Sequence, residues 1–325
     1  MTPAPPRVEV EAAEAGQLMV RWEPVGDHHV DIGYGPTPHA TAHTHVMRVP
    51  AGERSVQLID LPTAGRRPYV SLSRSGDVLI AAERRIPLDG VLNFRDLGGY
   101  PTASGRWTQW GLLFRSSSLH KLTADDLAVF DELGVRTIFD LRRDDERDRR
   151  PNPRPSRSLP VTGDVANMPD RSTLRDHDDA ERWLADYYRT MVTESGPVFG
   201  ELFTSLSAAD HTPAVFHCAA GKDRTGLTAA LLLTWLGVDR TTVLDDYELT
   251  GRYLTADAIP TVVDNFVATG LPRGAAEGIL SSPRWAMTQA LELIDTDHGG
   301  IEAYLRDSGG MTEQAMDDLR TRFVA

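Results

Sequence analysis

The chain has 325 residues, and 34 Lys and Arg against 47 Asp and Glu give it a formal net charge of −13. This acidity opposes general binding to polyanions, so no nucleic acid partner is expected. The longest nearly apolar stretch, residues 227–238, is too short to span a bilayer, so no stable membrane insertion is expected. The first residues lack the apolar run of a secretory signal, which predicts a cytoplasmic location and leaves secretion by another route open.

Residues 1–86 contain short alternating runs separated by Gly, Pro and Asp. Short runs of this kind, separated by turn residues, predict small antiparallel strands and a β-sandwich. Trp22, Leu61-Pro62 and Tyr69 resemble the fibronectin type III pattern. We therefore expect an accessory β-sandwich domain over residues 1–86, with an unknown protein partner as its candidate ligand.

Residues 87–325 alternate between helical and strand patterns. Residues 123–133 show helical spacing, "VRTIFD" and "PAVFHC" are typical of buried strands, and "TGLTAALLLTWLGV" predicts a buried helix. This alternation indicates an α/β domain with a central, mostly parallel sheet flanked by helices. The run 142–150 consists only of charged residues, which predicts a solvated helix face.

The only cysteine, Cys218, excludes an internal disulfide and a thiolate metal cluster. A lone cysteine after an apolar strand is either a small buried hydrophobe or a reactive thiol. The segment around it, His-Cys-Ala-Ala-Gly-Lys-Asp-Arg-Thr-Gly at positions 217–226, passes from a predicted strand into a predicted helix. Backbone N–H groups and the helix dipole at such a turn bind an oxyanion.

Side chains of this segment suit the same chemistry. Arg224 supplies paired donors for phosphate oxygens, which Lys222, a point charge, cannot do in the same way. Cys218 would lie beneath the bound anion, where positive groups favour its thiolate form. The small residues Ala219, Ala220 and Gly221 allow the loop to curve. The Cys218 thiolate, a nucleophile, would then face the electrophilic phosphorus of the bound group.

His217-Cys218, five residues, and Arg224-Thr225-Gly226 together resemble the phosphate-binding loop of the cysteine-dependent protein tyrosine phosphatases. The Lys222-Asp223-Arg224 sequence and "NFRDLGGY" at 93–100 are similar to an atypical bacterial branch, which includes a secreted mycobacterial phosphatase active on tyrosine and phosphoinositides. The resemblance covers residues 87–325. It implies the cysteine-phosphatase fold for this part of the chain, which we expect to be one domain.

The resemblance implies a two-step reaction in which Cys218 attacks phosphorus and water then hydrolyses the cysteinyl-phosphate. Arg224 and the loop amides would stabilise charge on the phosphoryl oxygens. Thr225 would donate a hydrogen bond to the leaving thiolate, and His217 would orient the loop. Neither a cofactor nor a metal is implied. The residues expected to bind the phosphate are Ala219, Ala220, Gly221 and Lys222, although Lys222 could also be a solvated side chain.

A general acid must protonate the leaving oxygen. The resemblance favours Asp223, inside the loop, and makes Asp140, at the end of the earlier strand, its rival. An Asp in the position of Asp140 also commonly caps a helix or pairs with a nearby Arg. Arg95 and Asp96 are expected to brace the site from behind.

The expected function is therefore a phosphomonoester hydrolase, most simply a protein tyrosine phosphatase, with phosphoserine, phosphothreonine or phosphoinositides as further candidate substrates. The alternative is a protein that binds phosphorylated partners through the loop and the β-sandwich without turning them over. Apolar residues within 257–285 predict either a helical lid over the site or an ordinary packed helix.

Overall fold

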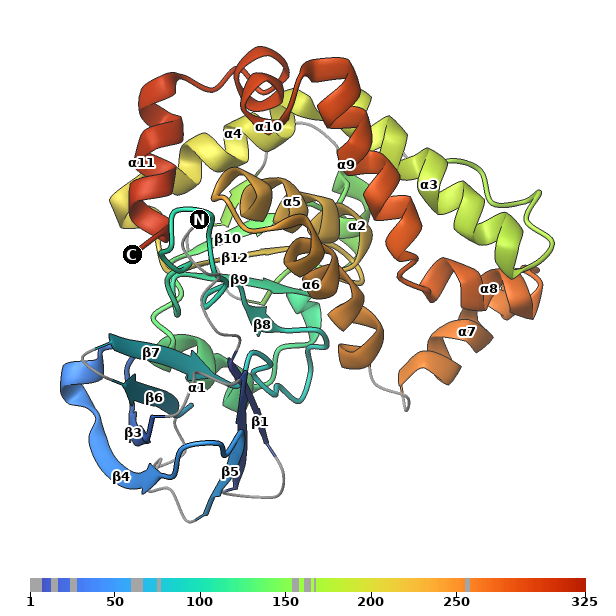
Figure 1. The fold of residues 1–325 in the computed structure, drawn as a ribbon. Helices are drawn as coiled ribbons and strands as arrows, with labels where there is room; N and C mark the ends of the chain where they lie inside the picture. The colour runs from blue at the N-terminus through green and yellow to red at the C-terminus, as the bar shows by residue number, and fades with distance from the viewer. Residues whose placement is uncertain are drawn as a thin grey trace.

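The computed structural model describes residues 8–12, 17–23, 28–59, 67–74, 77–153, 158–160, 165–166, 168–254 and 258–325. Figure 1 shows strands of the N-terminal part gathered at one end of the molecule and a second sheet surrounded by helices at the other. Leu61-Pro62, part of the fibronectin-like pattern, lies outside the described residues.

The N-terminal part contains two antiparallel sheets. One has the order β1-β2-β5 and the other the order β4-β3-β6-β7. Their hydrophobic side chains, among them Trp22, Ile32 and Val70, form one buried cluster to which both sheets contribute. The strands are β1 Val8–Ala12, β2 Leu18–Trp22, β3 Val30–Gly35, β4 Thr44–Val49, β5 Ser55–Leu58, β6 Tyr69–Arg74 and β7 Asp77–Ala82, with a short 3-10 helix at Ala40–Ala42.

The central sheet has the order β11-β10-β12-β9-β8. The pairs β11–β10, β10–β12 and β12–β9 are parallel, whereas β8 pairs antiparallel with β9. All residues of β9, β10 and β12 are buried, as in strands covered on both faces. The bounds are β8 Arg95–Asp96, β9 Leu113–Ser116, β10 Thr137–Asp140, β11 Ser158–Pro160 and β12 Ala214–His217.

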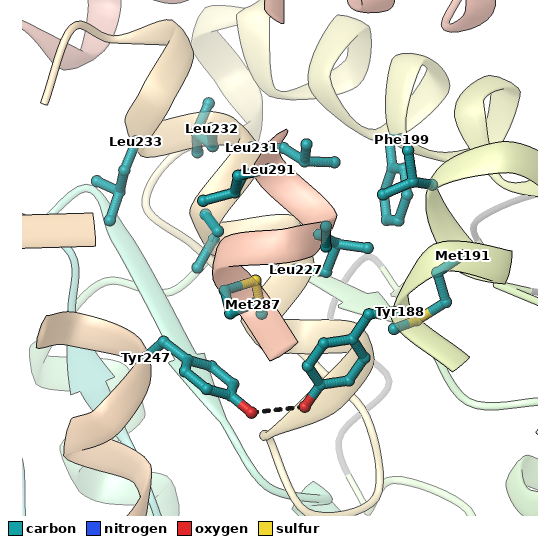
Figure 2. Close-up of a cluster of buried hydrophobic side chains, with 14 of the residues drawn as sticks. Tyr188, Met191, Phe199, Leu227, Leu231, Leu232, Leu233, Tyr247, Met287 and Leu291 are labelled. Carbon is teal, nitrogen blue, oxygen red and sulfur yellow. Dashed lines mark hydrogen bonds between the residues drawn. The ribbon is translucent and has the colours of Figure 1, made fainter. Parts of the chain in front are cut away.

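Helices surround this sheet, and α5 lies at the centre of the core. Leu227, Leu231 and Leu232 of α5 are fully buried and contribute to the cluster shown in Figure 2. The helices are α1 Ala124–Glu132, α2 Asp144–Arg149, α3 His177–Glu194, α4 Gly196–Ser207, α5 Asp223–Trp235, α6 Arg240–Tyr253, α7 Ala258–Ala268, α8 Arg273–Leu280, α9 Arg284–His298, α10 Ile301–Ala303 and α11 Glu313–Phe323. Shorter turns of helix are Leu119–Lys121, Ala209–His211 and the π-helical Tyr304–Ser308.

The two sheet systems are joined by polar contacts. Trp110 Nε1 donates a hydrogen bond to the Ile80 carbonyl of β7 at 3.0 Å. Arg67, just before β6, forms a buried ion pair with Asp96 of β8 at 2.6 Å. Over the part of the chain that the structure describes, no helix combines the length and the apolar character needed to cross a membrane.

Candidate functional site

The loop between β12 and α5 makes a tight turn around Cys218. Cys218 follows the last residue of β12 and is 2% exposed, and α5 begins at Asp223. Gly221 has a φ of 68°, in the left-handed region, and a Cβ there would collide with the Ser116 carbonyl group of β9. Any other residue at 221 would therefore distort the loop that surrounds Cys218.

A buried ionic network lies against the back of the loop. The Gly221 carbonyl accepts hydrogen bonds from Arg115 Nη2 and from Asn93 Nδ2, both at 2.9 Å. Arg115 Nη1 also donates to Asp246 Oδ2 at 2.6 Å, and Arg95 Nε donates to Asp246 Oδ1 at 3.2 Å. We call Arg95, Arg115 and Asp246 the floor of the loop.

The floor combines two buried arginines with one buried carboxylate. Burial alone raises the pKa of Asp246, but Arg95 and Arg115 lower it more, so its pKa lies well below the usual range and the carboxylate stays ionised. Burial, reinforced by Arg95, lowers the pKa of Arg115 to about 10 even though Asp246 acts in the opposite direction. Both arginines depend on the one carboxylate, so its removal would leave two unpaired cations in the core.

The two predicted braces of the site have different positions. Arg95 belongs to the floor and also contacts the Asn93 side chain, which reaches the loop. Asp96 points away from the loop: its carboxylate accepts from Arg67 and from the backbone N–H groups of Gly98 and Gly111. The reason is the alternation of a β-strand, which sends neighbouring side chains to opposite faces. Asp96 therefore joins the two sheet systems, and its role as a brace of the site stays a prediction.

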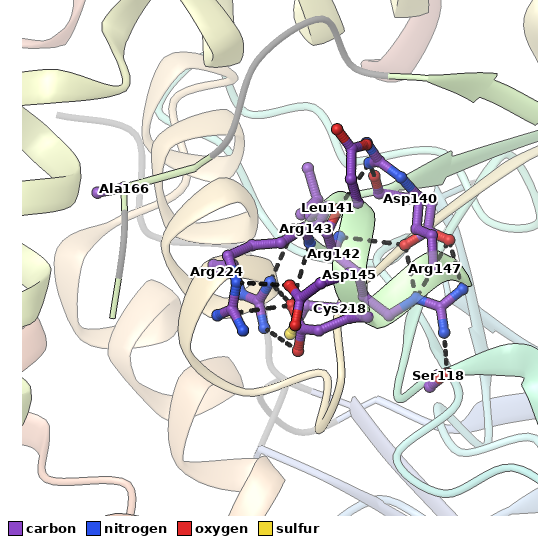
Figure 3. A network of polar contacts seen from close by, with 12 residues as sticks. Ser118, Asp140, Leu141, Arg142, Arg143, Asp145, Arg147, Ala166, Cys218 and Arg224 are labelled. Carbon is purple, nitrogen blue, oxygen red and sulfur yellow. Dashed lines mark hydrogen bonds and ion pairs between the residues drawn. The ribbon is translucent and has the colours of Figure 1, made fainter. Parts of the chain in front are cut away.

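Arg224, on the first turn of α5, is held by a residue that the sequence pattern did not single out. Its Nη1 and Nη2 donate to the two carboxylate oxygens of Glu146 at 2.7 and 3.1 Å, and Nη1 donates to the Leu141 carbonyl at 3.0 Å. Figure 3 shows Arg224 beside Cys218, next to the α2 segment. Burial lowers the pKa of Arg224, but Cys218 and Glu146 raise it overall, so the guanidinium is always charged.

The charged run 142–150 is therefore more than a solvated helix face. Arg142 is 3% exposed, and Glu146 reaches the loop from α2. The period of a helix predicts which residues share a face, but both faces of a fully charged helix look alike in sequence. We call residues 140–150 the wall of the site.

Asp140 is fully engaged at the base of the wall. Its carboxylate accepts from Arg142 Nε at 2.8 Å and from Nη2 at 2.6 Å, and also from Asn152 Nδ2 at 3.2 Å. Burial raises the pKa of Asp140, but the hydrogen bonds and charge of Arg142 lower it by more, so the net shift is downward. These contacts agree with the alternative, left open from the sequence, that Asp140 pairs with a nearby Arg.

His217 is buried and neutral. Its Nδ1 lies 3.1 Å from the Cys218 carbonyl and its Nε2 lies 3.0 Å from Asn152 Nδ2. Because an amide nitrogen is a donor, Nε2 accepts and Nδ1 carries the proton. Burial lowers the pKa of His217 to about 4, and the nearby Asp140 only partly opposes this. The ring thus connects the loop backbone to the wall.

Asp223 stands at the mouth of the loop within a second polar group. Tyr188 Oη donates to Asp223 Oδ1 at 2.7 Å and lies 2.6 Å from Tyr247 Oη, a contact visible in Figure 2. Lys222 Nζ lies 2.7 Å from the same Asp223 oxygen and donates to the Ser281 carbonyl at 2.8 Å. Lys222 is 1% exposed, so it is a buried cation and not a solvated side chain.

A cavity of about 370 Å³ opens over Cys218. Its lining includes the predicted loop residues Ala219, Ala220, Lys222, Asp223 and Arg224, together with Phe266 of α7 and Ile279 of α8. Gly221, Thr225 and Asp140 are not on the lining. The Thr225 hydroxyl is buried without a hydrogen-bond partner among the described residues, which leaves it able to donate to a nearby acceptor.

Helices α7 and α8 form one side of this cavity, where the sequence predicted either a lid or packed helices. Val263 is buried at 2%, whereas Val262 and Val267 are exposed at 36% and 37%. The side chain of Ile259 and residue Asp257 lie outside the described part of the chain. The pattern thus combines a packed face with an exposed apolar face.

Sequence reasoning missed four partners of the site, namely Glu146, Tyr188, Asp246 and Arg115. Their contacts connect positions far apart in the chain, and a single sequence carries no signal for such pairs. Within the described ranges, no group of three or more His, Cys, Asp or Glu side chains is arranged to hold a metal ion.

Comparison with known proteins identifies the family. A model of the tyrosine phosphatase family matches residues 86–325. The chain is 29% identical over 269 residues to the triple specificity protein phosphatase PtpB of Mycobacterium tuberculosis, covering 70% of this chain and 94% of PtpB. It is 28% identical over 222 residues to a tyrosine-protein phosphatase of Nostoc commune, covering 64% of this chain and 72% of that protein.

Among solved structures, P. aeruginosa TpbA in complex with phosphotyrosine matches 56% of this chain and 90% of its own chain, at 21% identity and a TM-score of 0.24. That structural likeness is too low to inform the site. The family model spans Cys218, Arg224 and the whole of the floor and wall. The chain belongs to the tyrosine phosphatase family.

Proposed function

We propose that this chain hydrolyses phosphotyrosine through a covalent phosphate on Cys218. The observation that carries the proposal is the loop itself: Cys218 and Arg224 line one cavity, on a turn that only glycine at 221 allows. In the first step the Cys218 sulfur forms a bond to phosphorus as the bond to the tyrosine oxygen breaks. In the second step water attacks the phosphorus and Cys218 leaves as thiolate.

Other loop groups supply charge stabilisation. Arg224 uses the donors that Glu146 does not occupy, together with the loop N–H groups, to bind the equatorial phosphoryl oxygens. The unpartnered Thr225 hydroxyl donates to the thiolate when it leaves. His217 holds the loop backbone through the Cys218 carbonyl and moves no proton.

Asp223 is the general acid of this proposal. It lines the cavity, whereas Asp140 is held by Arg142 with a lowered pKa and does not line it. A general acid must lie within reach of the leaving oxygen, and of the two carboxylates only Asp223 reaches the cavity over Cys218. Asp223→Asn is expected to remove the basic limb of the pH–rate profile, and Asp140→Asn to retain it. The reverse pattern would assign the proton transfer to Asp140.

The first experiment is hydrolysis of phosphotyrosine, phosphothreonine and phosphoinositide substrates by EDTA-treated protein, with vanadate as inhibitor. Cys218→Ser is expected to abolish turnover and keep the fold. If wild type and Cys218→Ser bind a phosphopeptide equally and neither turns it over, the chain is a phosphate-dependent binding protein instead.

We extend the proposal to phosphothreonine and phosphoinositides because PtpB is described as a triple specificity phosphatase. Residues 1–86 would be a fibronectin type III-like accessory domain for a protein partner, in a cytoplasmic enzyme. The shared core of the two N-terminal sheets supports a sandwich of this kind. Loss of a captured partner on deletion of these residues, with hydrolysis retained, would support the accessory role.

A further inference from the structure

A second cavity, of about 290 Å³, lies beside the phosphate loop. It shares Ala219, Arg143 and Glu146 with the cavity over Cys218, so the two spaces are neighbours. The reaction proposed above uses only the first cavity. A substrate that reaches beyond the phosphoryl group on Cys218 would enter the second.

The charge of this second cavity is opposite to that of the chain. Its lining carries a single carboxylate, that of Glu146, and four guanidinium groups, those of Arg142, Arg143, Arg149 and Arg150. The chain as a whole has a formal net charge of −13. Arginine presents paired N–H donors that match the oxygens of a phosphate group.

The arginines differ in how far they are already neutralised. Arg142 is paired with Asp140, and Arg143 and Arg149 both contact Asp145. For the Arg150 side chain, by contrast, no hydrogen bond or ion pair is found within the described residues. Arg150 is therefore the cation that can accept an anionic ligand without first breaking a pair.

His120, another residue of this lining, is also surrounded by positive charge. His120 lines the cavity, and its Nδ1 lies 2.9 Å from Ser118 Oγ. Its pKa is lowered by partial burial and also by the charges of Arg150, Lys121 and Arg142. Two of these cations, Arg150 and Arg142, line the same cavity as His120, so positive charge predominates on its wall.

We propose that this second cavity binds a second phosphate group of the substrate, in a peptide whose phosphotyrosine has a phosphorylated neighbour. The inference rests on the proposed phosphatase function and specifies the substrate of that same site. A peptide is favoured over a phosphoinositide in a bilayer because the acidic chain is repelled by an anionic surface.

The test compares kcat/KM for a phosphotyrosine peptide with that for the same peptide carrying phosphoserine at each neighbouring position in turn. In wild type the best doubly phosphorylated peptide is expected to gain on the order of tenfold, the effect of one charge-assisted contact. Arg150→Gln should reduce this ratio toward one. Arg189→Gln on α3, where the side chain is 61% exposed, removes the same charge elsewhere and should keep the ratio.

The outcomes separate the two proposals. A wild-type ratio of one at every position, or an equal loss in Arg189→Gln, overturns the second phosphate site while hydrolysis of the singly phosphorylated peptide upholds the phosphatase. Absence of any hydrolysis overturns the phosphatase itself. A gain confined to soluble inositol bisphosphate over monophosphate, absent in the peptides, overturns the peptide as occupant.

Discussion

The floor and the wall both hold the phosphate loop through arginine–carboxylate pairs, but they differ in contact with water. In the floor, the side chains of Arg95, Arg115 and Asp246 are at most 1% exposed. In the wall, burial is graded: Asp140 is 4% exposed, whereas Glu146 is 20% exposed. An ion pair near solvent contributes less to stability than a buried one, and removal of one partner costs less.

This difference assigns different tasks to the two regions. A fully buried network contributes to the fold, because removal of one member leaves the others charged and unpaired in a dry interior. A partly exposed carboxylate can be exchanged with little loss of stability. Changes in the floor should therefore appear mainly as unfolding, and changes at the outer wall mainly as altered turnover.

The largest effect is expected for Asp246→Ala. Arg95 and Arg115 would lose the carboxylate they share, and the free energy of unfolding should fall by about 3–5 kcal/mol. Urea unfolding measures this directly. The matched control is Asp245→Ala on the same helix, where the side chain is 42% exposed and pairs with Arg284, and where the loss should stay below about 1 kcal/mol. Equal losses in the two variants would mean that the buried floor contributes no more to stability than an exposed ion pair.

Much of the loop was predictable, because its chemistry is local in sequence. Cys218, Arg224 and the strand and helix on either side of them occupy adjacent positions, so spacing alone predicted a strand-to-helix anion site. The glycine at 221 was predicted for its curvature, and its left-handed φ confirms that need. The tyrosine phosphatase family was also predicted correctly from these residues.

The supports of the loop were not predictable for a physical reason. Asp246 lies more than a hundred residues from both Arg95 and Arg115 in the chain, and only the fold brings them together. Glu146 lies in a segment whose composition is typical of a solvated surface. Asp96 lies in a recognised motif, but a single sequence did not indicate its partner Arg67, which lies 29 residues earlier in the chain.

A second expected effect concerns the pH dependence of stability through His217, which lies beside Asp140 of the wall. Burial places the folded-state pKa of His217 at about 4, below the value of about 6.5 for an exposed histidine. Between these pH values the imidazole of residue 217 is protonated in the unfolded chain but not in the folded one. The free energy of unfolding therefore falls as the pH falls from about 6.5 to 4. The total contribution is about 3 kcal/mol.

His217→Asn removes this titration. The variant should therefore lose less stability than wild type when urea unfolding is repeated from neutral pH down to pH 4. His177→Asn on α3, where the side chain is 47% exposed, is the control and should follow wild type. Parallel pH curves for His217→Asn and wild type would mean that the ring is not held neutral by burial.

The smallest effect on stability is expected for Glu146→Gln at the outer wall. Glu146 remains ionised at neutral pH because Arg224, against the opposing effect of burial, lowers its pKa. The amide keeps one acceptor for Arg224 and loses the charge, so the free energy of unfolding should fall by only about 1 kcal/mol. Arg224 would be less firmly oriented toward phosphate, and kcat/KM for a phosphotyrosine peptide should fall about tenfold.

Asp145→Asn is the matched control for that change. Its carboxylate is 43% exposed, lies one position away on α2, and contacts Arg143 and Arg149 but not Arg224. Its kcat/KM for a singly phosphorylated peptide should therefore stay near that of wild type. A rise in kcat/KM for Glu146→Gln would show that the carboxylate competes with phosphate for the guanidinium. The wall would then restrain the site, whereas a fall confined to Glu146→Gln means that the wall positions Arg224 for the reaction.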